Sequence, residues 1–191
     1  MTAGATTSKS AGGVRAQFSD AVNIALGLRS LPAFEQFGTR PGGEIDLHQV
    51  GYLFLHTSDE AWAAAQRAVE LQNSLGVPTR LLTAAEAGAL SPGVSVDDVV
   101  GATFHPRDGY CSPENVVQGY AAGARSHGAT VRTGVEVTGI ETEGSAIVAV
   151  TTSSGRVATS TVVCAAGAWS RRVGEWVGVD LPIDPLRRQI L

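Results

Sequence analysis

Three short segments carry residue types that could hold an anionic ligand or a flat cofactor. The first combines hydroxyl, cationic and glycine residues in the run Ser8-Lys9-Ser10-Ala11-Gly12-Gly13, and Arg15 follows two positions later. Such a run presents backbone N–H groups and hydroxyls to an anion, and glycine lets the backbone approach a ligand closely. A frayed, serine-rich N-terminus explains the same composition, so this segment alone leaves both interpretations open.

The second segment is apolar and runs into small residues, in the order Val162-Val163-Cys164-Ala165-Ala166-Gly167-Ala168-Trp169. It predicts a buried strand followed by a helix start, and this geometry lets a cofactor lie against the carboxyl end of the strand. Tight packing of a strand on a helix explains the pattern equally well. The third segment, residues 49–55, predicts a strand after a glycine bend.

The histidines give a weaker signal. None of the four has an acid nearby at a spacing that implies a dyad, and they are His48, His56, His105 and His127. A histidine that titrates near neutral pH acquires a role only when a partner is placed beside it. We therefore interpret all four as surface or packing residues, and no residue is assigned as catalytic.

The cysteines and one pair of arginines give little evidence for a functional site. Cys111 and Cys164 stand alone, which predicts reduced thiols and neither a metal site nor a disulfide. Arg187 and Arg188 could clamp a carboxylate, but adjacent residues of a strand face opposite sides. At most one of the two arginines therefore points into a site.

Composition indicates a globular chain with a small-molecule ligand. The 191 residues are 43% hydrophobic and 17% charged, with a net charge of −4. This is enough apolar sequence for a core, and the scattered cations exclude the basic patch that nucleic acids and anionic membranes require. No apolar run approaches the roughly 20 residues of a membrane-spanning helix. We expect a soluble, cytoplasmic, mixed α/β body.

Local signals predict the elements that position these segments. Helices are expected to begin after capping residues at four places, namely Asp20 or Ser19, Ser58, Thr83 and Ser112. In the last of these helices, Gly119 and Gly123 leave room for close packing. Valine-rich alternation in residues 131–163 predicts short β-strands, with a turn at residues 152–155.

Taken together and in this order, the segments resemble the FAD-dependent amine and amino-acid oxidoreductases of the D-amino-acid oxidase superfamily, especially the branch of the sarcosine oxidase β-subunit and dimethylglycine dehydrogenase. The resemblance covers residues 4–18, 49–55, 108–110, 135–140, 163–169 and 185–189. It implies a partial FAD-binding, Rossmann-like domain interleaved with a mixed-sheet substrate domain. Residues 1–40 and 110–180 would belong mainly to the FAD domain, and residues 41–109 and 181–191 mainly to the substrate domain.

The resemblance also implies site residues. The loop near the FAD pyrophosphate and the flavin edge would consist of Ser8, Lys9, Ser10, Ala11, Gly12 and Gly13. Arg15 would lie near the flavin ring or the substrate carboxylate. The second FAD-contacting segment would supply Ala165, Ala166, Gly167 and Trp169. Val137 would contact the adenine through its backbone. Tyr52 and Arg188 match substrate-domain positions, where structural roles and binding roles fit equally well.

The cofactor expectation has two qualifications. Some relatives attach the flavin to a histidine in the first segment, but Lys9 or Ser10 occupies that place here, so non-covalent FAD is expected. These families also begin with a strand, a Gly-x-Gly-x-x-Gly turn and a helix, which this sequence lacks. We therefore expect a chain truncated at both ends that alone holds FAD weakly or not at all.

Two functional hypotheses follow. In the first, the parent protein oxidises a secondary or tertiary amino acid, such as sarcosine, by hydride transfer to the flavin, while cationic residues hold the carboxylate. It would act as a homo-oligomer or with a partner subunit. In the second, the chain is a flavin-free binding or assembly module derived from the same fold. A yellow preparation would favour the first hypothesis, and a colourless folded one the second.

Overall fold

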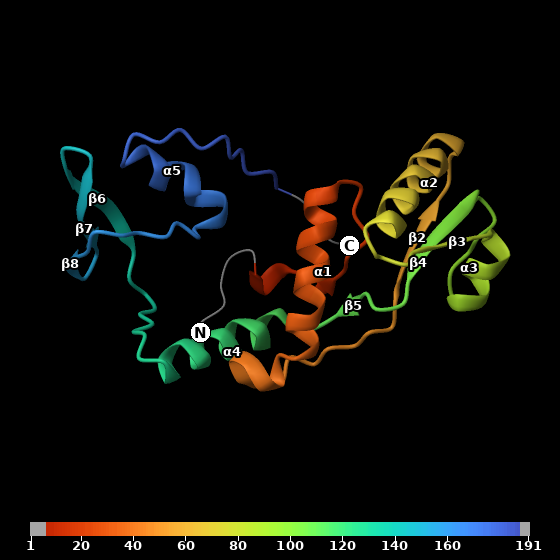
Figure 1. Ribbon diagram of the computed structural model, residues 1–191, viewed down its shortest axis with the longest axis horizontal. Helices are drawn as coiled ribbons and strands as arrows, with labels where there is room; N and C mark the ends of the chain where they lie inside the picture. The colour runs from red at the N-terminus through yellow and green to blue at the C-terminus, as the bar shows by residue number, and fades with distance from the viewer. Residues whose placement is uncertain (1–6, 188–191) are drawn as a thin grey trace. The chain divides into compact units, whose positions relative to one another are not determined.

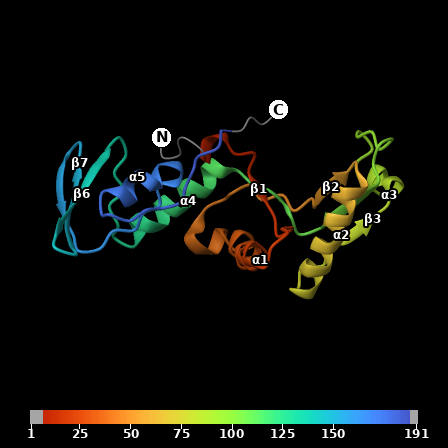
Figure 2. The same cartoon turned by 90° about the horizontal axis from the view of Figure 1, so that it is seen from above.

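The computed structural model describes residues 7–187, and the chain divides after Val131 into two compact units. We call residues up to Val131 unit 1 and the remainder unit 2, and Figures 1 and 2 show their elements. Both units mix helices with antiparallel sheets, so the mixed α/β class is confirmed. The expected division into an FAD-domain portion and a substrate-domain portion stays a prediction.

Unit 1 contains two small sheets among its described residues. Its elements are η1 (Thr7–Lys9), β1 (Gly13–Val14), α1 (Ala21–Glu35), η2 (Gly38–Gly42), β2 (Tyr52–His56), α2 (Asp59–Ser74), β3 (Arg80–Leu82), α3 (Ala84–Leu90), β4 (Gly101–His105), β5 (Gly109–Tyr110) and α4 (Pro113–Ser126). Strand β1 pairs with β5, and the other sheet has the order β2-β4-β3. All of these pairings are antiparallel.

The four α-helices that the structure describes in unit 1 begin at predicted capping residues, and the first begins at Asp20 and not at Ser19. In each case the capping side chain accepts a hydrogen bond from a backbone N–H three residues later: Asp20 from Asn23, Ser58 from Ala61, Thr83 from Glu86, and Ser112 from Asn115. Such a cap typically contributes about 1 kcal/mol. The helix starts are therefore fixed by local chemistry.

The main core of unit 1 packs around α1 and the turn that follows it. Ile24, Leu31 and Phe37 are almost completely buried there. The two glycines of α4 meet this region: a Cβ at Gly119 would overlap the ring of Phe37, and one at Gly123 would lie 2.7 Å from a carbon of Pro41. The prediction that these glycines allow close packing is confirmed.

A buried polar network ties the N-terminal segment to the turn between β4 and β5. One carboxylate oxygen of Asp108 accepts the backbone N–H of Ala16 at 2.9 Å and lies 2.7 Å from Nδ1 of His105. The other oxygen accepts from Nε2 of Gln17 at 3.2 Å, and the same Nε2 also donates to the carbonyl of Tyr52 at 2.9 Å. Asp108 is 0% exposed and His105 is 1% exposed.

The prediction that no histidine has an acid partner is therefore wrong. The turn after β4 folds the chain back on itself, which brings Asp108 to His105 three positions before it. A second pair lies at the surface, where Nε2 of His48 is 2.8 Å from Asp46. In the buried pair the backbone turn after β4 creates the contact.

Unit 2 is built from a three-stranded meander and two short helical turns. Its elements are β6 (Val137–Glu143), β7 (Ala146–Thr152), β8 (Gly155–Ala158), η3 (Gly167–Trp169) and α5 (Ser170–Glu175). The strands pair in the order β6-β7-β8, with Thr152 opposite Gly155. The predicted turn at residues 152–155 is confirmed, and Gly155 supplies the positive φ of +116° that it needs.

The predicted strand at residues 162–163 is wrong. Residues 161–166 form no strand, and Val163 is 87% exposed. Valine favours a strand only where a neighbouring strand supplies hydrogen-bond partners and a packing surface. Within the described part of the chain, no strand pairs with this segment.

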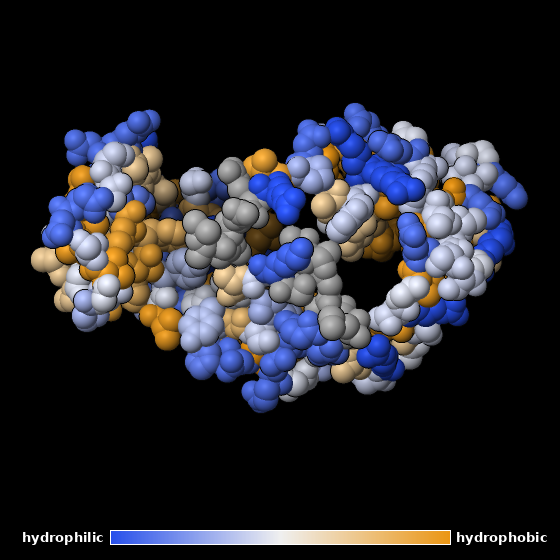
Figure 3. Space-filling view, turned by 180° about the vertical axis from the view of Figure 1, so that it is seen from behind, coloured by the Kyte–Doolittle hydropathy of each residue, from blue (hydrophilic) through white to orange (hydrophobic). Residues whose placement is uncertain are grey.

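Hydrophobic residues reach the surface in both units, and orange areas mark them on one face in Figure 3. Val22 in unit 1 and Leu186 in unit 2 are among the most exposed. No helix in residues 7–187 is both long and apolar enough to cross a membrane.

Replacing Asp108 with Asn tests the buried network. An amide has one acceptor oxygen where a carboxylate has two. In the variant, the NH2 group of the amide would therefore face one of the two donors from which Asp108 accepts a hydrogen bond, the N–H of Ala16 or Nε2 of Gln17. We expect Asp108→Asn to lower the free energy of unfolding by about 2–4 kcal/mol. Urea unfolding followed by circular dichroism measures this change. Asp98→Asn at an exposed position is the control, and equal losses in the two variants would contradict the assignment.

Candidate functional site

The glycine-rich segment lies against the start of α4. Oγ of Ser10 accepts the backbone N–H of Gly12 at 3.1 Å, and Gly12 has a φ of +74°. A Cβ at Gly12 would overlap the carbonyl oxygen of Cys111 and lie 3.2 Å from Cδ of Pro113. Internal packing therefore already requires glycine at this position. Contact of the segment with FAD stays a prediction.

The other predicted residues of this segment differ in accessibility. The exposed ones are Lys9, Ser10, Ala11 and Gly13. A Cβ at Gly13 would lie 3.2 Å from the hydroxyl of Tyr52, so the segment also packs against the first residue of β2. Ser8 belongs to η1, and Arg188 lies outside the described residues.

Arg15 lies in a cavity of about 420 Å³ within unit 1, which we call the Arg15 cavity. The carbon of its guanidinium is 4.6 Å from the ring centre of Phe18 and 5.2 Å from that of Phe54. Contact with two aromatic rings restrains the cation. Among residues 7–187, no carboxylate forms a salt bridge with Arg15. One guanidinium nitrogen, Nη1, donates to the carbonyl of Gln17 at 3.3 Å. Contact of Arg15 with a ligand carboxylate stays a prediction.

The remaining walls of the Arg15 cavity come from β2, β4 and α2. The residues that line it are Arg15, Gln17, Phe18, Ser19, Phe54, His56, Ala61, Ala64, Ala65, Ala68, Val69, Gln72 and Thr103. Phe54 and His56 face the same side of β2 because side chains alternate along a strand. Tyr52 shares that face, and its ring centre lies 5.2 Å from that of Phe54, but Tyr52 does not line the cavity.

A second candidate site lies within unit 2, and we call it the Trp169 pocket. It measures about 320 Å³ and is lined by Glu136, Val137, Ala166, Trp169, Arg172, Val173 and Trp176. Three of these residues are ones that the resemblance implies for FAD, although Val137 is far in sequence from Ala166 and Trp169. Ala165 and Gly167 flank Ala166 without lining the pocket, and Gly167 has a positive φ of +55°.

The Trp169 pocket fits part of FAD. Its walls are mostly apolar, and Trp169 is 59% exposed and Val137 44% exposed, which leaves flat hydrophobic surface for a ring system. Its volume is at the low end of the roughly 300–1,000 Å³ that is usual for small-molecule sites. It therefore suits one end of a dinucleotide. The carboxylate of Glu136 supplies an acceptor for hydroxyl or amino donors of such a ligand.

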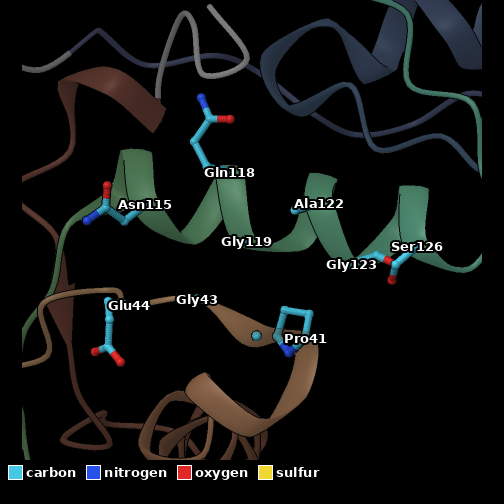
Figure 4. Close-up of a pocket in the computed structure, with 10 residues that line it drawn as sticks. Pro41, Gly43, Glu44, Asn115, Gln118, Gly119, Ala122, Gly123 and Ser126 are labelled. Atoms are coloured by element: carbon cyan, nitrogen blue, oxygen red, sulfur yellow. The ribbon is translucent and has the colours of Figure 1, made fainter.

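A third hollow, of about 480 Å³, lies between residues 41–44 and α4 (Figure 4). Small residues form much of its wall, among them Gly43, Gly119, Ala122 and Gly123. It contains none of the predicted site residues that the structure describes. We therefore assign it no binding role.

Sequence reasoning missed several residues that line the Arg15 cavity. His56 was interpreted as a surface or packing residue, although it stands two positions after Phe54 on one strand and so shares its face. Gln72 follows Val69 by three positions, which places both on one face of α2. Gln17 is close to Arg15 in the chain, but only the fold shows that its side chain is buried.

Solved structures share this fold. The crystal structure of L-proline dehydrogenase from P. horikoshii matches with a TM-score of 0.86 and 32% identity, covering 93% of this chain and 47% of that one. In sequence, the glycine oxidase of Geobacillus kaustophilus (strain HTA426) is 32% identical over 92% of this chain and 48% of its own length. Mitochondrial dimethylglycine dehydrogenase of Rattus norvegicus is 26% identical over 99% of this chain and 22% of its own length.

These similarities define the fold of a family of FAD-dependent oxidoreductases. The family described as FAD dependent oxidoreductase matches residues 1–191, so the chain belongs to that family. The resemblance inferred from the ordered segments is thereby confirmed. The chain spans about half the length of the glycine oxidase and of the L-proline dehydrogenase that it matches.

His56 generates a prediction about pH. Burial lowers the pKa of His56 from its ordinary value of 6.5, and Arg15 is the charged group that lines the same cavity. The unfolded chain therefore binds a proton at His56 at a higher pH than the folded chain does. Above about pH 6.5, His56 is neutral in both states and does not reduce the free energy of unfolding. As the pH falls from there toward the lowered pKa, the unfolded chain takes up the proton first, and the free energy of unfolding decreases.

We expect His56→Phe to lose less stability than the native chain between about pH 7 and about pH 5.5, because it lacks this proton uptake. Urea midpoints at the two pH values measure the difference. Other titrating groups are common to both proteins and cancel in the comparison. Parallel pH profiles would contradict the prediction.

Proposed function

We propose that this chain is part of an FAD-dependent enzyme that oxidises a secondary or tertiary amino acid by hydride transfer to the flavin. The observation that carries the proposal is the Trp169 pocket, where Val137, Ala166 and Trp169 meet although they come from separate segments. Family membership supports FAD as the cofactor. Bound FAD would accept the hydride and so supply the oxidation chemistry.

In this proposal the FAD contacts are those that the family resemblance implies. The backbone at Val137 contacts the adenine, and residues 165–167 with Trp169 form the second contact. Lys9, Ser10 and the backbone N–H groups around Gly12 serve the pyrophosphate, because cations and N–H donors favour an anion. Lys9 or Ser10 occupies the place where the resemblance would put a flavin-linking histidine, which supports non-covalent binding.

Arg15 holds the substrate carboxylate in this proposal. The three relatives are named for L-proline, glycine and dimethylglycine, which share a carboxylate one carbon away from the amine nitrogen. A guanidinium matches a carboxylate with two parallel N–H bonds. The rings of Phe18 and Phe54 restrain that guanidinium before the substrate arrives, so less side-chain freedom is lost on binding.

Trp169 tests the cofactor assignment. Stacking of a base on an aromatic side chain contributes about 1–3 kcal/mol, so Trp169→Ala should weaken FAD binding by about tenfold or more. The anisotropy of flavin fluorescence during titration measures the affinity. Val163→Ala is the control, because Val163 is exposed in the same unit and does not line the pocket. Equal affinities for Trp169→Ala and the native chain would overturn the assignment.

Cys164 offers an independent readout of the same contact. Hydrogen bonds from the Ser170 side chain and the Ala166 backbone lower the pKa of this exposed thiol. Because a lowered pKa makes more reactive thiolate, iodoacetamide should alkylate Cys164 readily. FAD bound against residues 165–167 should slow that alkylation.

The reaction itself is tested by mixing the FAD-loaded chain with sarcosine or L-proline without oxygen. Loss of the yellow flavin absorbance is expected, and Arg15→Met should require a much higher substrate concentration because the carboxylate loses its partner. A loaded chain that keeps its colour with every small amino acid would refute the proposed reaction. A folded chain without affinity for FAD would instead favour the flavin-free module.

A further inference from the structure

The Arg15 cavity contains polar atoms whose hydrogen-bonding capacity is unused. The side-chain oxygens of Gln17 and Gln72 and the Nε2 of His56 are buried and have no partner in the described part of the chain. All three side chains line the cavity. Gln17 and Gln72 are each only 4% exposed. Unpaired buried polar groups are costly, so three around one cavity indicate a ligand that pairs with them.

The orientation of both glutamine amides is fixed by their donor ends. Nε2 of Gln17 donates to the carbonyl of Tyr52 at 2.9 Å and to Asp108 at 3.2 Å. Nε2 of Gln72 donates to the carbonyl of Phe18 at 2.8 Å. Turning either amide around would set oxygen against oxygen. The two glutamine oxygens are therefore acceptors, and N–H or O–H donors would satisfy them.

The other residues that line the cavity restrict the chemical class of the ligand. Arg15 carries the only permanent charge among the residues that line the cavity, and four alanines of α2 form an apolar, small-residue wall. One cation and two amide oxygens complement a small molecule that carries one carboxylate and more than one N–H donor. An amino acid with a protonated amine has this combination.

We propose that Gln17 and Gln72 accept two N–H groups of the amine whose carboxylate pairs with Arg15, and that His56 lines the same subsite. The inference rests on the proposed function, because it takes the ligand to be the substrate. A protonated secondary amine such as sarcosine or L-proline offers two N–H groups, whereas dimethylglycine offers one. The cavity thus selects primary and secondary amino acids over tertiary ones.

Matched ligand pairs test this selectivity on the native chain. Calorimetric titration compares sarcosine with dimethylglycine, and L-proline with N-methyl-L-proline, in the absence of flavin. One acceptor left unpaired should weaken binding of the tertiary member by about tenfold. Equal affinities within both pairs would overturn the inference, and so would failure of every amino acid to bind.

A variant separates recognition from general structural damage. Gln72→Leu removes one acceptor, and Gln66→Leu at an exposed position of the same helix is the control. In Gln72→Leu the affinity ratio of sarcosine to dimethylglycine should fall toward one, whereas a merely structural effect would weaken both ligands equally. A ratio that stays at its native value would contradict the role of Gln72.

The proposal of an FAD-dependent enzyme and the proposal of an amine subsite can fail separately. Selectivity between matched amines without affinity for FAD would support this inference and count against the flavoenzyme proposal for the chain. Reduction of bound flavin by sarcosine and dimethylglycine with equal affinity would support the enzyme and overturn the subsite.

Discussion

The buried carboxylate of Asp108 is the constraint on which the Arg15 cavity depends. It accepts hydrogen bonds from the backbone N–H of Ala16 and from the side chain of Gln17, so it fixes the two residues that follow Arg15. Arg15 is the immediate neighbour of Ala16, and its contact with two aromatic rings follows from that position. Because Asp108 also meets His105 at the end of β4, the same carboxylate sets the N-terminal segment against the sheet that forms the cavity wall. The position of Arg15 therefore depends on a buried hydrogen-bond network centred on Asp108, which does not itself line the cavity.

Helices were predictable from the sequence to a greater extent than strands, and the reason is physical. A cap such as Thr83 with Glu86 acts within four residues, so the sequence contains everything that fixes the helix start. A strand needs a partner from elsewhere. Residues 162–163 have the composition of a strand, but no strand in the described part of the chain pairs with them.

The candidate site was predictable in part. The ordered resemblance placed Val137, Ala166 and Trp169 together in the cofactor contact, and they do line one pocket, although FAD contact stays a prediction. The polar atoms around Arg15 could not be found in this way. Gln72 and His56 belong to a helix and a strand whose packing brings them together, and the spacing along the chain carries no signal of that packing. The only local indication of such a site in the sequence is a polar residue on the buried face of a helix, as at Gln72.

The separation between paired residues also has a consequence for how the protein is made. The strands of unit 2 pair with their immediate neighbours in the sequence, so that sheet closes only short loops. Ala16 and Asp108 are 92 residues apart. Closing such a long loop is slow, and the chain leaves the ribosome N-terminus first. Val14 and Ala16, which are buried in the folded protein, therefore stay without their partners until Asp108 and β5 have been synthesised, so the last-made part of unit 1 covers its first-made part.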